Sequence, residues 1–471
     1  MRIAFVNLPH PIPVIRRYMC SYNATMFLFP PLELMYAATA AREMAGADVV
    51  LIDSIAHRLD KQALLKRLED FRPDLVVTLF GFEILEDDVK AVRWLRRQLP
   101  ETKFAGFGHY PTTFPDEILR HADLDFVLRG EPEYPVVELC AALEAGRGCG
   151  EIQGLTWRAE DGRPVSAPDR PRVRHVDELP DPDYGLVDVH RYSEFMLPNP
   201  FAAVQTARGC PYTCNFCVRS YGQKLTMRSP QRVVAELKNL VERFGIRSFR
   251  FTDDTFTAIP KRTLEICEGI RKEGLNLEWT CLTRIDTMDD QRAQALREAG
   301  CSRVFIGVES GSDRILQKYG KGYSVDRIPA VVDLLHKHGI EVGSFFMVGH
   351  PEETKEDFEE TCRLVRTLEI DYATIGRTVP YPGTPLYDEY QDQVEFSLFP
   401  YKNEWKDPAR KRTLEAWERR FMREMYLRPS YIARHAWRLL KNPASTLKAG
   451  KAVLPFLFSS GMPEAARNEV L

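Results

Sequence analysis

The sequence lacks the long apolar run of a membrane helix. No stretch approaches the roughly 18 consecutive apolar residues that such a helix needs. Residues 1–8 read as a strand, and they lack the longer apolar core and the small-residue cleavage site of a signal peptide. We therefore expect a soluble, cytoplasmic protein.

The sequence also lacks an excess of charge of either sign. It contains 64 Lys and Arg residues against 67 Asp and Glu residues, which gives a formal net charge of −3. A protein that binds nucleic acid through its phosphates usually carries a clear basic excess or a basic patch. The composition therefore predicts no nucleic-acid partner.

Cysteine is sparse, with ten residues in a chain of 471. That number is too small for a disulfide scaffold. Seven of the ten are scattered, and we interpret each as a small buried apolar side chain: Cys20, Cys140, Cys149, Cys267, Cys281, Cys301 and Cys362. The remaining three lie within eight residues of one another, and this clustering needs a chemical explanation.

Strand-like and helix-like segments alternate over residues 1–145. The strand-like segments are 2–8, 49–53, 75–80, 103–107 and 126–128, and the helix-like segments are 30–45, 61–71, 87–99 and 134–143. Such alternation is typical of a parallel sheet with helices on both faces. We predict a doubly wound, Rossmann-like α/β domain for residues 1–145.

Residues 146–196 are rich in Pro, Asp and Arg, and we interpret them as a linker with one hairpin near 156–158. The alternation restarts over residues 197–390. Its strand-like segments are 203–206, 248–252, 277–283, 303–308, 341–348 and 373–377, and the helix-like segments between them include 230–244, 261–272, 289–299, 325–338 and 355–368. Six βα units predict a partial (β/α)₆ barrel, whose site would lie at the C-terminal ends of the strands.

Residues 391–471 carry few strand signals, and we predict a helical C-terminal region. Residues 414–426 form a charged amphipathic pattern, and residues 437–458 alternate between basic and apolar stretches. The plain interpretation is a helical cap on the barrel. The alternative is a surface that touches a membrane peripherally or binds a partner.

The three clustered cysteines follow a predicted strand in the segment Arg208-Gly-Cys-Pro-Tyr-Thr-Cys-Asn-Phe-Cys217. This C-x₃-C-x₂-C spacing in a tight loop can turn Cys210, Cys214 and Cys217 toward one cubane iron–sulfur cluster. Structural zinc usually shows two C-x₂-C pairs or added histidines, and neither is evident. Three thiolates would leave one iron of a cubane free to bind a substrate or cofactor.

A C-x₃-C-x₂-C loop with an aromatic residue before its last cysteine, placed after the first strand of a βα barrel, resembles the radical S-adenosylmethionine (SAM) superfamily. The resemblance spans residues 201–388. It implies a [4Fe-4S] cluster whose open iron binds SAM, and a 5′-deoxyadenosyl radical formed when one electron cleaves the sulfonium. It also implies an electron donor such as flavodoxin or ferredoxin.

Segments at later strand ends match the superfamily in order and position: 252–256, 283–286, 307–311, 348–354 and 381–385. The resemblance implies that SAM is bound by residues from these segments and from the cysteine loop, namely Phe216, Thr252, Asp253, Asp254, Arg284, Glu309, Ser310 and Gly349. Structural alternatives stay open: the two aspartates could cap the next helix, Glu309 could pair with Arg284, and residues 349–351 could form only a turn.

The first domain has neither a G-x-G-x-x-G after its first strand nor a phosphate-binding G-x-x-x-x-G-K-[ST] loop, so nicotinamide cofactors and nucleoside triphosphates are disfavoured. Its strand ends instead carry Leu-Phe-Gly81, Gly106-Phe-Gly-His109 and Arg-Gly130-Glu131, and Pro30-Pro31-Leu32 stands at the start of the first predicted helix. These features resemble the cobalamin-binding domains of class B radical SAM methyltransferases. The implied cobalamin-binding residues are Pro30, Gly81, Phe82, Glu83, Gly106, Gly108, His109, Gly130 and Glu131.

The sequence departs from some cobalamin proteins in lacking D-x-H-x-x-G, whose histidine binds cobalt from below. His57 follows Asp53 at the wrong spacing. Bound cobalamin would therefore lack that ligand, and Phe82 or Glu83 would lie nearest its lower face. The alternative is a domain that only packs on the barrel and binds nothing.

By resemblance, the expected activity is cobalamin-dependent radical methylation of an unactivated carbon, or of a phosphorus, on a small-molecule or lipid-like substrate. An unactivated carbon is a poor nucleophile toward a sulfonium, and radical formation removes that limit. The nearest alternative is a cobalamin-containing oxidative cyclase or another radical rearrangement. A non-catalytic iron–sulfur protein is a more distant alternative.

Overall fold

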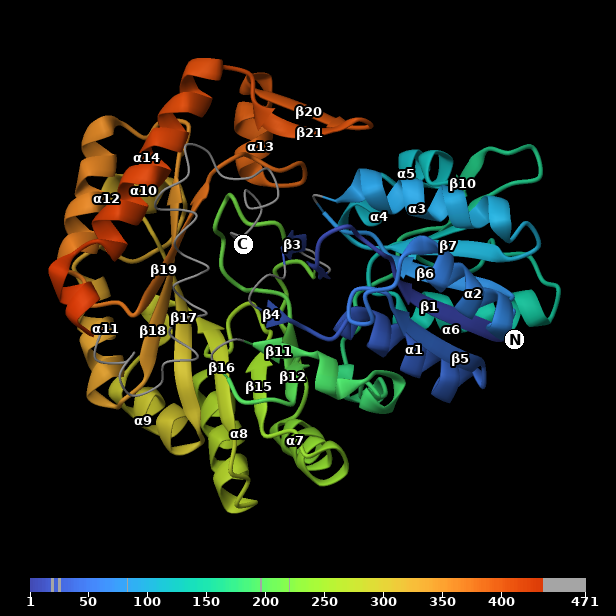
Figure 1. The fold of residues 1–471 in the computed structure, drawn as a ribbon, viewed down its shortest axis with the longest axis horizontal. Helices are drawn as coiled ribbons and strands as arrows, with labels where there is room; N and C mark the ends of the chain where they lie inside the picture. The colour runs from blue at the N-terminus through green and yellow to red at the C-terminus, as the bar shows by residue number, and fades with distance from the viewer. Residues whose placement is uncertain (18–20, 24–26, 83, 195–196, 220, 435–471) are drawn as a thin grey trace.

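The structure is a computed structural model that describes residues 1–471 except 18–20, 24–26, 83, 195–196, 220 and 435–471. Two α/β lobes lie side by side (Figure 1). The first lobe runs from blue to cyan, and the second runs from green to red. The α/β fold predicted from the alternating segments is confirmed in both lobes.

The first lobe is built on a seven-stranded sheet in the order β10-β9-β8-β7-β6-β1-β5. Its strands are β1 (Arg2–Asn7), β5 (Asp48–Asp53), β6 (Leu75–Leu79), β7 (Lys103–Phe107), β8 (Phe126–Leu128), β9 (Leu155–Arg158) and β10 (Pro164–Ser166). The first five are parallel, and their order reverses between β1 and β6. Such a reversal opens a crevice at the C-terminal ends of the strands, where doubly wound domains bind ligands.

The central strand β1 shows why this sheet could be predicted from the sequence. Phe5 of β1 lies opposite Leu51 and Val77 of the two neighbouring strands, and its side chain is fully buried. Helices cover both faces, so the strands are continuous apolar runs. The helices are α1 (Leu32–Ala45), α2 (Lys61–Phe71), α3 (Leu85–Gln98), α4 (His109–Thr113), α5 (Pro115–His121) and α6 (Glu133–Glu144).

The predicted hairpin near residue 156 is confirmed as β9 and β10. These strands pair antiparallel onto β8, so the sheet continues past the predicted boundary at residue 145. The rest of the predicted linker is irregular and folds along both lobes. Its elements are the 3₁₀ helices η1 (Val176–Glu178), η2 (Tyr184–Leu186) and η3 (Val189–Arg191), and the strand β11 (Ser193–Glu194). The strand β11 pairs with β4 (Phe27–Leu28) of the first lobe. Earlier in the chain, β2 (Val14–Arg16) pairs with β3 (Ser21–Asn23).

The second lobe contains a six-stranded parallel sheet whose strand order follows the chain. Its strands are β12 (Phe201–Val204), β15 (Ser248–Phe251), β16 (Glu278–Thr283), β17 (Cys301–Glu309), β18 (Glu341–Val348) and β19 (Tyr372–Arg377). The helices are α7 (Pro230–Phe244), α8 (Pro260–Lys272), α9 (Asp290–Glu298), α10 (Asp313–Lys318), α11 (Arg327–Lys337), α12 (Lys355–Thr367) and α13 (Pro385–Tyr390), with η4 (Ile285–Thr287) after β16. This open barrel confirms the six predicted βα units.

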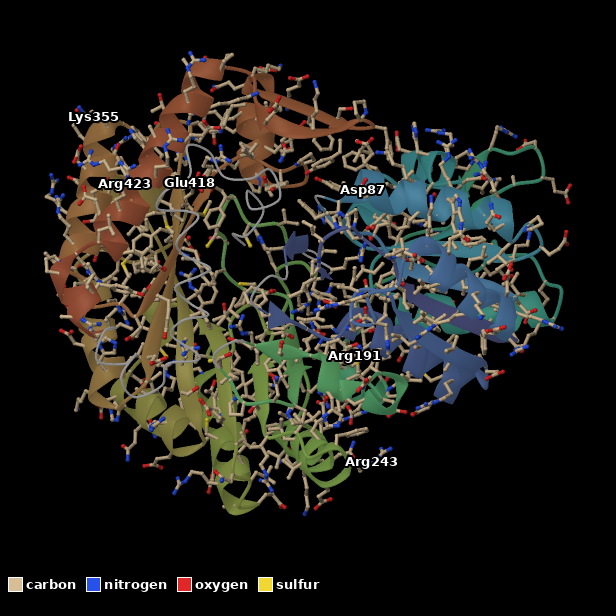
Figure 2. The ribbon with its side chains drawn as sticks, in the orientation of Figure 1. Asp87, Arg191, Arg243, Lys355, Glu418 and Arg423 are labelled. Atoms are coloured by element: carbon tan, nitrogen blue, oxygen red, sulfur yellow. The ribbon has the colours of Figure 1, made fainter. Side chains whose placement is uncertain are left out.

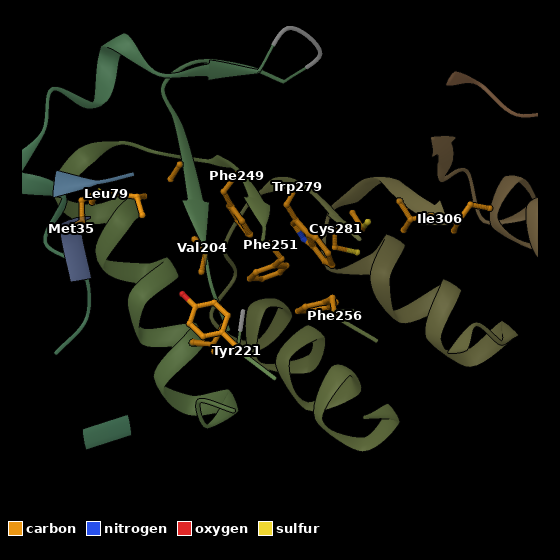
Figure 3. Packing of buried hydrophobic residues seen from close by; sticks show 14 of the residues in the cluster. Met35, Leu79, Val204, Tyr221, Phe249, Phe251, Phe256, Trp279, Cys281 and Ile306 are labelled. Carbon is orange, nitrogen blue, oxygen red and sulfur yellow. The ribbon is translucent and has the colours of Figure 1, made fainter. Parts of the chain in front are cut away.

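An aromatic cluster packs beneath the first strands of the barrel (Figure 3). The rings of Phe251 and Phe256 stack with centroids 4.4 Å apart, and Trp279 meets both edge-on. The indole of Trp279 donates a hydrogen bond to the carbonyl of Ala299 at 2.7 Å. Phe251 ends β15 and Phe256 lies in the loop after it, so these large buried rings pack beside the strand end that carries Asp253 and Asp254.

The C-terminal region corrects one expectation. Residues 391–405 were expected to be helical, but after η5 (Gln391–Gln393) they form an antiparallel hairpin, β20 (Val394–Leu398) and β21 (Tyr401–Trp405). Apolar and polar residues alternate along β20, which is the strand signal that was overlooked, whereas β21 has three consecutive polar residues between Tyr401 and Trp405.

The helix α14 (Pro408–Tyr426) contains the predicted helical segment 414–426 and packs against β19 and α12. Lys355 and Arg423 lie on α12 and α14, on the side of the barrel away from the first lobe (Figure 2). The basic and apolar stretch at 437–458 lies outside the described residues. No helix among the described residues is long and apolar enough to cross a membrane.

Candidate active site

The three clustered cysteines lie in a loop with a short stem after β12. The stem pairs β13 (Ala207–Arg208) with β14 (Thr226–Met227). Gly209 has a φ of +86°, and a Cβ there would lie 2.6 Å from the carbonyl oxygen of Lys224. Only glycine fits this turn, so the chain can enter the cysteine loop directly from the stem.

Contacts from the barrel hold the middle of this loop. The amide of Asn215 donates to the carbonyl of Tyr319 at 3.1 Å, and its side chain donates to the carbonyl of Lys318 at 2.9 Å. The carbonyl of Asn215 accepts from the amide of Leu386 at 3.0 Å. The loop is therefore fixed by the end of α10 and the start of α13, which rigidifies the backbone between the cysteines.

The donor set fits an iron–sulfur cluster. Cys210, Cys214 and Cys217 are free thiols, and Arg284 donates from Nη1 to the sulfur of Cys214 at 3.4 Å. Burial raises the pKa of the Cys210 and Cys217 thiols, so a bound cation is needed to hold them as thiolates. Within the described part of the chain, no three His, Cys, Asp or Glu residues are grouped to hold one metal ion. The three thiols of the loop suit a cubane, in which each thiolate binds a different iron.

Two buried cations flank the loop. Besides Arg284, Lys321 donates from Nζ to Glu309 at 2.8 Å, and the ammonium lies 5.9 Å from the ring of Phe216. Glu309 ends β17 with a φ of +63°, where the pairing with β18 shifts register. Sequence reasoning missed Lys321, which lies in a loop without a recognisable motif.

The two aspartates after β15 have different roles, and neither caps the next helix. Asp253 accepts hydrogen bonds from the amides of Thr206 and Ala207 at 2.6 and 3.1 Å, so it holds the end of β12. Burial, and then the charge of Asp253, raises the pKa of Asp254 to about 6. Asp254 in turn helps to raise the pKa of two of the loop cysteines. It is the carboxyl group suited to a cationic ligand there.

Three of the other residues predicted to bind SAM serve the framework. The hydroxyl of Thr252 donates to Val204 at 3.4 Å, and that of Ser310 lies 3.2 Å from the hydroxyl of Thr361. At Gly349, with a φ of +99°, a Cβ would lie 2.7 Å from the side chain of Leu414. Four of the predicted SAM-binding residues lie in the cysteine loop or around it: Phe216, Asp254, Arg284 and Glu309. The anticipated pair between Glu309 and Arg284 is absent, because Arg284 pairs with Asp286 at 2.9 Å.

Aromatic rings gather where the strand ends of the first lobe meet the barrel. The ring of Phe82 stacks on Tyr110 at 4.5 Å and lies 5.0 Å from His109 and 4.8 Å from Tyr381, which follows β19. Burial lowers the pKa of His109 to about 4, so its imidazole is neutral at pH 7. Its Nε2 is buried without a hydrogen-bond partner among the described residues. That atom fits a polar group of a bound ligand.

The glycines of the first lobe divide into two groups. A Cβ at Gly106 or Gly108 would lie 2.4 Å from the ring of Phe80 or 2.9 Å from its carbonyl oxygen, so local packing explains both. At Gly130, with a φ of +73°, a Cβ would meet no atom of the described residues within 4 Å, which leaves room for a ligand. The open Gly130 and the unpartnered His109 nitrogen fit a corrin at this edge.

The remaining residues predicted to bind cobalamin have protein partners or lie outside the description. Gly81 donates its amide to Asp88 at 2.7 Å, and the carbonyl of Pro30 accepts from the amide of Leu32 at 2.8 Å. Glu131 accepts from Arg208 of the cysteine-loop stem at 2.9 Å. Glu83 lies outside the described residues.

Comparisons with known proteins agree with this geometry. A family model described as the radical SAM superfamily matches residues 204–365, and one described as a B12 binding domain matches residues 25–140. An uncharacterized methyltransferase of Pyrococcus horikoshii is 36% identical over 363 residues, covering 76% of this chain and 78% of the relative.

Two further relatives are more distant. The anaerobic magnesium-protoporphyrin IX monomethyl ester cyclase of Rubrivivax gelatinosus is 27% identical over 374 residues, covering 78% of this chain and 67% of the relative. The structure of the radical SAM methyltransferase TsrM from Kitasatospora setae, with cobalamin and a [4Fe-4S] cluster bound, matches with a TM-score of 0.69. Its sequence identity is 21%, over 83% of this chain and 78% of that one.

The open barrel and its three-thiol loop define an iron–sulfur enzyme that uses SAM. The chain belongs to the radical SAM superfamily, within the class in which a B12 binding domain precedes the barrel. Its cofactors are a [4Fe-4S] cluster, SAM and cobalamin.

Proposed function

We propose that this enzyme methylates an unactivated carbon, or a phosphorus, of a small-molecule or lipid-like substrate. One observation carries the proposal: the ring of Phe82, at a strand end of the B12 binding domain, lies 4.8 Å from Tyr381 at the mouth of the barrel. The predicted cofactor-binding edges of the two lobes are therefore in contact at this point. The Pyrococcus horikoshii relative, itself described as a methyltransferase, supports the same reaction class.

When bound, the cluster and SAM supply a radical, and cobalamin supplies a methyl group. The residues of the chain place and protect these groups. Arg284 and Lys321 place two buried cations beside the cysteine loop, each paired with a carboxylate, and Arg284 donates a hydrogen bond to the Cys214 sulfur that favours its thiolate form. Asp254 offers a carboxylate to the ammonium group of SAM.

The buried rings between the lobes form an apolar, water-poor contact beside the predicted cofactor-binding edges. Phe82 is 6% exposed and Tyr110 is 1% exposed, and the neutral His109 packs against both. A dry, aromatic wall protects a reactive intermediate from side reactions. It also favours an apolar portion of a substrate, in keeping with a lipid-like molecule.

Oxidative ring closure is the second candidate, because the Rubrivivax gelatinosus relative is described as a cyclase. Both reactions would begin with removal of a substrate hydrogen. They differ in the product, since methylation adds a CH₂ unit in mass and cyclisation does not. Methylation also requires that a methyl group pass from SAM to cobalamin, and ring closure does not.

The test uses anaerobically reconstituted protein, cobalamin and SAM with a deuterated methyl group. A chemical reductant supplies the electron in this assay. A flavodoxin or ferredoxin as the biological electron donor stays a prediction. Mass spectrometry then follows the deuterated methyl group. Its transfer to bound cobalamin is the expected result. Retained cobalamin that never acquires the label, in protein that still cleaves SAM, would contradict methyl transfer and favour the cyclase.

A further inference from the structure

Arg208 is a fully buried cation between the two lobes, two residues before the first cluster cysteine. Only 2% of its surface is exposed. Its Nη1 donates to Glu131 at 2.9 Å and its Nη2 donates to Glu133 at 2.5 Å. Its Nε donates to the side chain of Gln205 at 3.0 Å, within its own lobe. One guanidinium thus binds the stem of the cysteine loop to two carboxylates of the first lobe.

The two carboxylates belong to the edge of the first lobe that is expected to hold cobalamin. Glu131 follows Gly130, the glycine with open space around its missing Cβ. Its second oxygen accepts from the amide of Val173 at 2.8 Å, so the side chain cannot rotate freely. Glu133 is the first residue of α6, where a helix N-terminus favours a negative charge. Glu131 is therefore held in place independently of Arg208, and Glu133 is favoured as a charged carboxylate by its position on the helix.

Aromatic rings complete the enclosure. The guanidinium carbon of Arg208 lies 5.0 Å from the ring centroid of Tyr36 and 5.4 Å from that of Tyr221. Tyr36 belongs to α1 of the first lobe, and its hydroxyl donates to the carbonyl of Gln205 at 3.4 Å. Tyr221 follows the cysteines in the loop. The cation is thus packed against both lobes as well as paired across them.

The charges nearly balance in this desolvated setting. Burial alone would lower the pKa of Arg208, but the carboxylates of Glu133 and Glu131 hold it well above its usual value. A second guanidinium contributes, because the Nε of Arg172 lies 3.9 Å from Glu131. A lysine could not replace Arg208, because a point charge cannot reach three acceptors in one plane.

We propose that Arg208, Glu131 and Glu133 form a positioning unit that fixes the iron–sulfur loop against the cobalamin-binding edge. A change on either side of this unit is then felt at the cofactor of the other lobe. The inference rests on the proposed function, because it requires that both cofactors are bound.

The test measures each substitution at the cofactor of the opposite lobe, in anaerobically reconstituted full-length protein. Arg208→Lys changes the cluster lobe, and the readout is the dissociation constant of hydroxocobalamin by optical titration. We expect it to rise about tenfold, as when groups supporting a metal ligand are altered. Glu131→Gln changes the cobalamin lobe, and the readout is the electron paramagnetic resonance spectrum of the reduced cluster. We expect its g-values to shift.

Glu341→Gln is the matched control. Glu341 pairs with the buried Arg303 at the opposite ends of the barrel strands, and we expect both readouts to stay at the wild-type values. Should Arg208→Lys fail to fold, the cluster spectra of Glu131→Gln and Glu133→Gln decide the matter. Both crossed effects together support the unit.

An unchanged cobalamin affinity in Arg208→Lys, or an unchanged cluster spectrum in the Glu131→Gln protein, would overturn the inference. Failure of the proposed function gives a different result. Wild-type protein would then retain no cobalamin, or would never transfer the deuterated methyl group to it.

Discussion

The smallest unit of the chemistry is one thiol. Cys210, Cys214 and Cys217 share a loop that the barrel holds at Asn215, and each is needed to bind a separate iron. We expect replacement of any one by Ala to abolish cluster assembly and SAM cleavage. Iron counting and detection of 5′-deoxyadenosine provide the measurements.

The matched controls are two other cysteines of the same lobe. Cys267 and Cys362 are buried in the helices α8 and α12, as expected for small apolar side chains. Cys267→Ala and Cys362→Ala should keep the cluster and the cleavage activity. A variant of a loop cysteine with full cleavage would contradict the assignment.

Asp254 makes a second prediction at this scale. Its pKa of about 6 means that it is neutral at pH 5 and ionised above pH 7. A cationic ligand prefers the ionised form, so SAM affinity should increase as the pH rises through 6. Asp254→Asn should weaken binding by about tenfold at pH 7.5, or about 1.4 kcal/mol, and should remove the pH dependence.

Equilibrium binding of SAM to the reconstituted protein between pH 5 and 8 provides the measurement. Asp290→Asn is the control, because Asp290 is an exposed residue of α9 on the outside of the barrel. An affinity that stays constant across this range in wild-type protein would show that Asp254 does not face the ligand.

Among the elements, those with a strong period were predictable. The helix α7 and the strand β18 begin and end at the predicted residues. The helix has one apolar face, and the strand is buried on both faces, so each gives a clear sequence pattern. The short strands β2, β3, β4 and β11 were not predicted. They contain two or three residues each, and their pairing depends on distant partners that local pattern does not reveal.

The hairpin of β20 and β21 makes a prediction of its own, because it docks onto the first lobe. Leu398 is buried in the core of that lobe, and the hydroxyl of Tyr401 lies 3.2 Å from that of Tyr110. We expect Leu398→Ala to lower the free energy of unfolding by about 2–3 kcal/mol. Tyr401→Phe should cost about 1 kcal/mol or less.

Denaturant unfolding of the two variants provides the measurement. Val165→Ala is the control, because Val165 is an exposed apolar residue of β10 and should change stability little. A Leu398→Ala protein as stable as wild type would show that the hairpin does not join the lobes in solution.

The start of α12 carries a pH-dependent element. Burial raises the pKa of Glu353 to about 7, although the amides of Gly349 and His350 partly oppose the rise. The folded form therefore prefers a neutral carboxyl, and this contribution is present below pH 4.5 and is lost as the pH rises through 7. Glu353→Gln should raise the melting temperature at pH 8 more than at pH 5. The corresponding gain in the free energy of unfolding at pH 8 is up to about 3 kcal/mol.

Thermal unfolding at both pH values measures this effect. Glu356→Gln serves as the control, because Glu356 is exposed in the first turn of the same helix. Equal shifts at pH 5 and pH 8 would contradict a buried, neutral Glu353.

At the scale of the whole molecule, the sequence revealed each cofactor domain but not how the two meet. The loop cysteines were predictable because three identical ligands lie within eight residues. Lys321 and Arg208 were not assigned roles, because their partners lie on other elements or in the other lobe. Contacts of this kind depend on the packing of the lobes, to which the local pattern of a segment contributes little.

The central claim is that one chain holds both cofactors across the interface between its lobes. Anaerobic reconstitution with iron, sulfide and hydroxocobalamin, followed by gel filtration, optical spectra and metal counting, tests it most directly. The account predicts near-stoichiometric cobalamin together with about four irons per chain. A cluster with no retained cobalamin would contradict it, and would reduce the first lobe to a packing role.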